Sequence, residues 1–155
     1  MLKSVLCITI IIASLAVGLY YSSRLSQRVS VLSDMISLLE EVNAKIKYTA
    51  APLAELFENN FTGFRFEVNQ PFERQFSELV HRYNDVLTTE DLRLLDELGR
   101  DLGTSDVDSQ QRLIRLSITV LTQQRDQAQT EVTNKGKLYR ILPLSAGIAA
   151  AILLL

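Results

Sequence analysis

Two long uncharged runs at the ends of the chain constrain its fold more than any other feature. From Ser4 to Ser23 there are 20 consecutive residues without a charge, rich in Ile, Leu and Val. About 20 apolar residues is the length that a helix needs to cross a bilayer. The final run, Ile141 to Leu155, is also uncharged and would extend roughly 22 Å as a helix. We therefore predict transmembrane helices over residues 1–23 and 141–155.

Each run has an alternative interpretation. For the first it is a cleaved signal peptide, because Lys3 supplies a charged start, but the apolar stretch is longer than the usual core of a signal peptide. For the second, which is short for a full crossing, it is a buried core helix. Arg140 could snorkel to the headgroups and the bilayer could thin slightly, so a crossing remains possible. We favour a membrane helix at both ends.

Basic residues gather where the central region meets the two predicted membrane segments. They are Arg24, Arg28, Lys135, Lys137 and Arg140, whereas only Lys3 and the amino group lie beyond the first segment. Loops rich in Lys and Arg tend to stay in the cytoplasm. The chain is thus predicted to be a two-pass protein of the cell membrane with a cytoplasmic centre.

Residues 24–140 have the composition of a soluble helical domain. They carry every charged side chain except Lys3. The whole chain has a net charge of −2, so no basic field is available to hold a nucleic acid, and we expect no nucleic-acid partner. The whole chain has only 6 Gly and 3 Pro residues and no Trp, and no β-type alternation of useful length occurs. The fold class is predicted to be all-α, a cytoplasmic helical bundle over residues 24–140.

Apolar spacing and capping residues outline the helices of this bundle. Spacings of three and four predict a helix from Val31 to about Tyr48, continuous with the first membrane segment. Thr49 as a cap and Pro52 as an early helical residue predict a short helix that runs through Leu53, Leu56 and Phe57 and ends at Asn59-Asn60. Another should begin near Pro71, whereas residues 61–69 remain unassigned.

Two further helices complete the prediction. Thr88 and Asp91 resemble a capping box that opens a helix ended by Gly99 or Gly103. Ser105 with Asp108 suggests a second cap, followed by a continuous helix of about 50 Å to Arg140. The first and last long helices should pair antiparallel and continue into the two transmembrane helices.

The sequence contains few groups suited to catalysis or metal binding. Cys7 is the single cysteine, which excludes an internal disulfide and a Cys-based metal site. His81 is the single histidine, with Glu78 and Asp85 at helical spacing, and we interpret it as a surface or half-buried side chain. Acidic clusters lack metal-loop spacing, and no phosphate-binding glycine-rich loop occurs. We predict no enzyme activity, no metal and no cofactor.

Two segments carry a family resemblance. The stretch Leu98 to Asp106, followed by Gln110, Gln111 and Ile114, and the run Ile46 to Leu53 resemble the stage III sporulation protein AB family of spore-forming bacteria. The resemblance extends over nearly the whole chain. Ala51 stands where the family pattern has Thr, and the family's glycine-rich turn is poorly represented around Thr62-Gly63.

The resemblance implies a function and partners. It implies a platform subunit of the sporulation channel complex between mother cell and forespore, in the mother-cell membrane around the forespore. The soluble part is similar to the domain of the platform protein in type II secretion and type IV pilus systems. The partners implied are a secretion-type ATPase, other channel membrane proteins and the lipid bilayer.

Polar residues in and after the Gly99–Asp106 loop are candidate partner contacts. They are Arg100, Asp101, Asp106, Gln110 and Gln111. Polar loops on rigid scaffolds often carry recognition. The alternative is purely structural, because a glycine helix stop and a Ser105 cap would account for several loop residues.

Two other function classes remain beside the platform subunit: a membrane-tethered adaptor or signalling regulator, and a membrane-bound hydrolase. An adaptor would show a longer unbroken heptad register and few caps. The several capped short helices between Thr49 and Ser105 favour a compact bundle instead.

Overall fold

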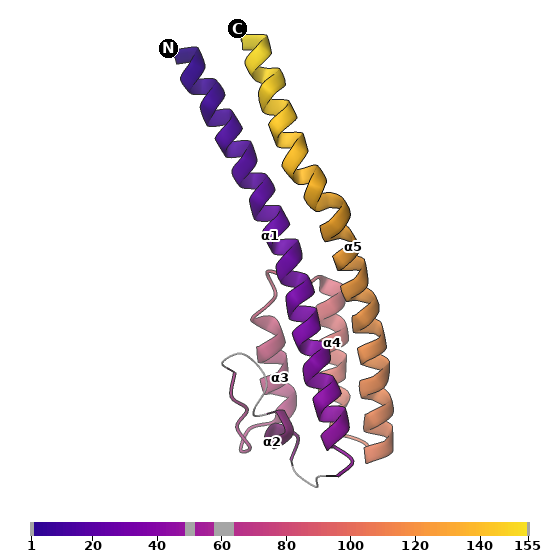
Figure 1. Cartoon of the computed structure of the whole chain (residues 1–155). Helices are drawn as coiled ribbons and strands as arrows, with labels where there is room; N and C mark the ends of the chain where they lie inside the picture. The colour runs from indigo at the N-terminus through magenta and orange to yellow at the C-terminus, as the bar shows by residue number, and fades with distance from the viewer. Residues whose placement is uncertain (1, 49–51, 58–63, 155) are drawn as a thin grey trace. The chain divides into compact units, whose positions relative to one another are not determined.

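The computed structural model describes residues 2–48, 52–57 and 64–154, and all regular structure within them is helical. The helices, labelled in Figure 1, are α1 (Leu2–Lys45), α2 (Leu53–Phe57), α3 (Phe72–His81), α4 (Thr89–Asp101) and α5 (Val107–Leu154). The predicted all-α fold class is confirmed. The chain divides into two compact units, one made of Arg28–Asp126 and the other of the segments Met1–Gln27 and Gln127–Leu155.

The two long helices have the predicted continuity. α1 runs without a break from Leu2 into the bundle, and α5 runs from Val107 to Leu154. Within the described residues, no helix combines the length and the hydropathy needed to span a membrane. Most side chains of the predicted membrane segments, 1–23 and 141–155, lie outside the described residues. The transmembrane assignment therefore stays a prediction.

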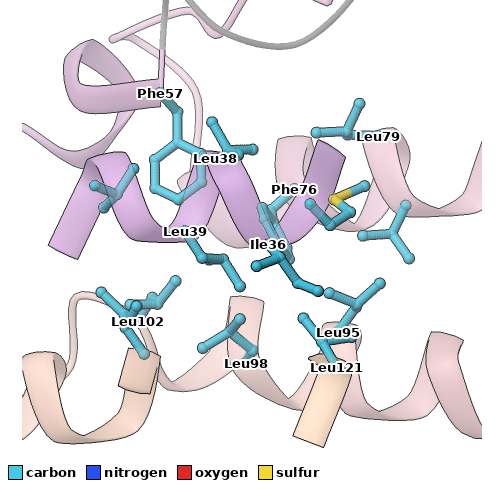
Figure 2. Close-up of a cluster of buried hydrophobic side chains, with 14 of the residues drawn as sticks. Ile36, Leu38, Leu39, Phe57, Phe76, Leu79, Leu95, Leu98, Leu102 and Leu121 are labelled. Atoms are coloured by element: carbon cyan, nitrogen blue, oxygen red, sulfur yellow. The ribbon is translucent and has the colours of Figure 1, made fainter. Parts of the chain in front are cut away.

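Apolar stripes of the helices form one core within the Arg28–Asp126 unit. α1 contributes the largest share because its predicted three-and-four spacing buries a broad face. Figure 2 shows side chains from all five helices meeting in this cluster. The fully buried members include Leu32, Leu39, Phe57, Phe76, Leu79, Leu95, Leu98, Ile114 and Leu121. Since each large apolar side chain stabilises by about 2 kcal/mol when buried, this shared core holds the helices together.

Aromatic packing and one glutamine organise the segment that the sequence left unassigned. Phe64 and Phe66 are buried, and the ring centroid of Phe66 lies 5.4 Å from that of Phe57 and 5.6 Å from that of Phe72. The buried amide of Gln75 accepts from the backbone N–H of Glu67 at 2.6 Å and donates to its carbonyl at 2.8 Å. This amide takes the place of a neighbouring strand, so the backbone stays satisfied without regular structure.

The predicted capping signals around α3 and α4 are confirmed. α3 begins directly after Pro71. At the start of α4, the Thr88 hydroxyl accepts from the backbone N–H of Asp91 at 3.2 Å, and the Asp91 carboxylate accepts from the backbone N–H of Thr88 at 2.9 Å. α1 ends at Lys45, with a turn reaching Tyr48. The predicted Thr49 cap and the Asn59-Asn60 stop lie outside the described residues.

Gly99 does not end α4, as one of the two predictions had it. It lies inside the helix, where an added Cβ would stand 2.6 Å from Cδ1 of Phe76 on α3. The residue that ends the helix is Gly103, just after Leu102. Its φ is +87°, a backbone angle that residues other than glycine rarely adopt. Gly99 thus allows α4 to pack closely against α3, and Gly103 allows the chain to turn after α4.

Candidate interaction surface

The loop between α4 and α5 has a conformation fixed by the backbone of Gly103 and by a hydrogen bond from the Thr104 side chain. The positive φ of Gly103 turns the chain, and the Thr104 hydroxyl donates to the carbonyl of Asp101 at 2.8 Å. A Cβ at Gly103 would lie 3.0 Å from the Leu53 side chain of α2. The loop therefore has a defined conformation and closely approaches α2.

The N-cap of α5 is Asp106, not Ser105 as predicted. An Asp106 carboxylate oxygen accepts from the backbone N–H of Ser109 at 3.1 Å, and the helix begins at Val107. Hydrogen bonds from the side chain and then from the backbone of Ser109 hold the pKa of Asp106 below its usual value. Aspartate and serine are both good N-caps, so capping preference alone could not decide between adjacent positions. Asp106 is thus part of the helix start.

We expect Asp106→Ala to lower the midpoint of thermal unfolding, because the N–H of Ser109 loses its acceptor. Ser105→Ala is the matched control: it removes only a hydroxyl, whereas the Ser105 carbonyl, which accepts from Gln110, stays in place. Circular dichroism melts of residues 24–140 measure both. Equal midpoints for the two variants would contradict the assignment of the cap.

Two of the candidate contact residues use their side chains inside the bundle. Gln110 and Gln111 are each only 9% exposed. The Gln110 amide donates to the Ser105 carbonyl at 2.7 Å, and that of Gln111 donates to the Asn43 carbonyl of α1 at 3.1 Å. The first bond steadies the loop and the second joins α5 to α1, so neither side chain is presented to a partner.

Arg100 and Asp101 are the candidates that the fold leaves exposed at the end of α4. Arg100 Nε lies 3.7 Å from a carboxylate oxygen of Glu73 on α3, and both side chains remain more than half exposed. Sequence reasoning missed Glu73, because only the packing of α3 against α4 brings it beside Arg100. Such an exposed pair contributes little to stability and is available for recognition.

His81 has a different partner from those suggested by helical spacing. Its Nε2 lies 3.1 Å from an Asp96 oxygen on α4, and the Ser77 hydroxyl donates to the other Asp96 oxygen at 2.9 Å. Ser77 thus bonds to the carboxylate and is not oriented by the imidazole as a nucleophile would be. The arrangement joins α3 to α4. In the part of the chain that the structure describes, no group of His, Cys, Asp and Glu could hold a metal ion.

These features define a class: an all-helical protein with a capped bundle, two long terminal helices and an exposed charged loop. The chain belongs to the stage III sporulation protein AB family, whose model matches residues 3–155. No curated protein and no solved structure matches it. The resemblance noted in the sequence is confirmed, and family membership gives the protein a role in stage III of sporulation.

Proposed function

We propose that this protein is a non-catalytic platform subunit of a secretion-like channel complex between mother cell and forespore. In this proposal it resides in the mother-cell membrane with two transmembrane helices, and its bundle lies in the cytoplasm. Its partners are a secretion-type ATPase, other membrane proteins of the channel and the lipid bilayer. It needs no cofactor.

The observation that carries the proposal is the match of the whole chain to a stage III sporulation family. The bundle adds support, because a rigid helical scaffold that presents charged side chains at a fixed loop suits protein–protein contact. Arg100 and Asp101, in the last turn of α4 before that loop, are exposed. A membrane-tethered adaptor is the alternative, but the three short helices that follow α1 in the chain and share its core make a compact bundle and not one extended coiled coil.

We expect Arg100→Glu or Asp101→Lys to reduce co-purification of the ATPase with the full-length protein roughly fivefold, about 1 kcal/mol of binding. Folding should be unchanged, because exposed charges usually alter stability by less than about 0.5 kcal/mol. Affinity purification from sporulating cells, with immunodetection of both proteins, measures the effect. Sporulation should stall while the protein level stays normal.

Arg93→Glu is the matched control for these variants. Arg93 lies on the same helix, is 72% exposed and has its own acidic neighbour, Glu97, at 3.7 Å. It should leave the ATPase association intact. If the Arg100 and Asp101 variants behave like Arg93→Glu, the loop is only a helix connector. If even the unaltered full-length protein brings down no ATPase, the tethered adaptor becomes the better account.

A further inference from the structure

Opposite charges occupy one exposed stretch of α1, residues 34–40, and one exposed stretch of α5, residues 112–116, in the Arg28–Asp126 unit. On α1, Asp34 and Glu40 are exposed, with the small side chain of Ser37 between them. On α5, Arg112 and Arg115 are exposed, and Leu116 beside them keeps 64% of its surface accessible. The α1 stretch is thus acidic with a small side chain at its centre, and the α5 stretch is basic with an exposed leucine, whereas Asp108 and Asp126 are exposed farther along α5 on either side of it.

These opposite charges also lie at matching levels along the bundle. The Gln111 amide donates to the Asn43 carbonyl, and α1 and α5 run in opposite directions there (Figure 1). Because both helices rise by about 1.5 Å per residue, four residues onward from Gln111 correspond to four residues back from Asn43. Arg115 is therefore level with Leu39, next to Glu40. Leu116 is level with Leu38, next to Ser37.

We propose that α5 of one copy packs against α1 of the next copy, with Leu116 over Ser37 and Arg115 beside Glu40. The inference rests on the proposed function, which gives every copy the same orientation in one membrane. If neighbouring copies are related by rotation about an axis parallel to α1 and α5, every residue keeps its height along that axis. Residues of α1 and α5 that lie at the same height within one copy therefore also lie at the same height in two neighbouring copies. Such a head-to-tail contact uses two different faces and extends to further copies.

Charge favours this pairing over a symmetric dimer. Two α1 faces together would oppose Asp34 and Glu40 with the same carboxylates, and two α5 faces would oppose arginines with arginines. Like charges across an interface disfavour a pairing, whereas opposite charges fix its register. Covering Leu116 adds an apolar contact. Each contact is weak, but confinement of all copies to one membrane raises their effective concentration.

Cross-linking between differently tagged full-length copies tests the pairing. In a Cys7→Ser background, one copy carries Ser37→Cys and the other Thr119→Cys, which lies one turn beyond Arg115 and leaves Leu116 intact. With a short thiol cross-linker in membranes, we expect the mixed dimer to exceed either self-linked dimer at least fivefold. Val68→Cys, exposed elsewhere on the bundle, is the control partner and should give little product. Predominant self-linking, or no mixed dimer, would overturn the proposal.

A charge exchange in trans provides the second measurement. Glu40→Arg in the Ser37→Cys copy, or Arg115→Glu in the Thr119→Cys copy, should lower the mixed dimer at least fivefold. Both changes together should restore it, since the opposite charges meet again with reversed sign. Arg93→Glu should have no effect. Failure of the paired reversal to restore the product refutes the α1–α5 contact.

The ATPase co-purification is scored separately on the same membranes. Mixed dimers that follow the charge exchange, without any bound ATPase, would support the interface and refute the platform role. ATPase binding by copies that form no mixed dimer would support the platform role and refute the interface.

Discussion

Asp91→Ala will lower the free energy of unfolding of the bundle by about 3 kcal/mol, the usual cost of breaking a buried ion pair. The Asp91 side chain is fully buried, and its two oxygens accept from Arg28 Nε at 2.8 Å and from Arg28 Nη2 at 3.0 Å. One of these oxygens also accepts from the backbone N–H of Thr88. Alanine leaves the arginine without its partner and removes half of the capping box. Urea unfolding of residues 24–140, followed by circular dichroism, measures the loss.

Glu90→Ala is the matched control, since Glu90 lies beside Asp91 in the first turn of α4 and is exposed. It should change the free energy by less than about 0.5 kcal/mol. Comparable losses for the two variants would mean that helix-end charge, and not the bond to Arg28, stabilises this end of the bundle.

The Asp91 contribution should also depend on pH. Burial alone would raise the pKa of Asp91, but hydrogen bonds from Arg28 and Thr88 outweigh it and hold the pKa below the ordinary value of 3.8. Because the folded state binds this proton less readily, the stabilisation is complete above pH 3.8 and is lost as the pH falls through the lower, folded-state pKa. The difference between the unaltered protein and Asp91→Ala should therefore be constant near neutral pH and shrink in acid. A difference that grows in acid would contradict the lowered pKa.

Gly99→Ala will destabilise the bundle by about 2 kcal/mol, the usual cost of overpacking a core. The new Cβ would lie 2.6 Å from Phe76 Cδ1 and 3.4 Å from two other ring atoms. Phe76 is fully buried, so its ring cannot move away without disturbing the core. On an open helix the same change would stabilise by about 1 kcal/mol, because alanine is the better helix former. The sign of the effect in urea unfolding thus reports the contact.

A double-mutant cycle separates the contact from other effects of the new methyl group. Phe76→Leu alone should destabilise, since it leaves a gap beside Gly99, but adding Gly99→Ala to it should cost much less than Gly99→Ala does alone. Additive effects would show that the clash with the Phe76 ring is not the cause.

Local sequence signals predicted most of the helices and little of the contact geometry between them. Pro71 marks a helix start through its own restricted φ, and the Thr88–Asp91 box does so through two residues three apart, so both can be recognised without knowing the fold. The Ser105 prediction was wrong by one position because the adjacent Asp106 is an equally suitable cap. Residues 64–69 lacked a signal because Gln75 and the aromatic cluster, not a periodic pattern, fix them.

The candidate contact residues show the same division. The sequence placed Arg100, Asp101, Gln110 and Gln111 together in one polar segment. Only the tertiary structure showed that the two glutamines are buried, that Arg100 and Asp101 are exposed, and that Asp106, the fifth candidate, is exposed but caps α5. Burial depends on what the neighbouring helices cover, which no residue's own polarity determines.

By itself the sequence determined the family, the all-helical class and the approximate course of five helices, because these follow from periodicity, caps and motif residues along the chain. The tertiary structure alone decided that Asp91 meets Arg28, 63 residues away, and that Gly99 lies against Phe76. It likewise showed that His81 contacts Asp96 on α4, whereas helical spacing suggested the acidic residues on its own segment. The physical reason is that these contacts depend on how the helices pack in the shared core, and side-chain spacing within one helix carries no information about the face of another.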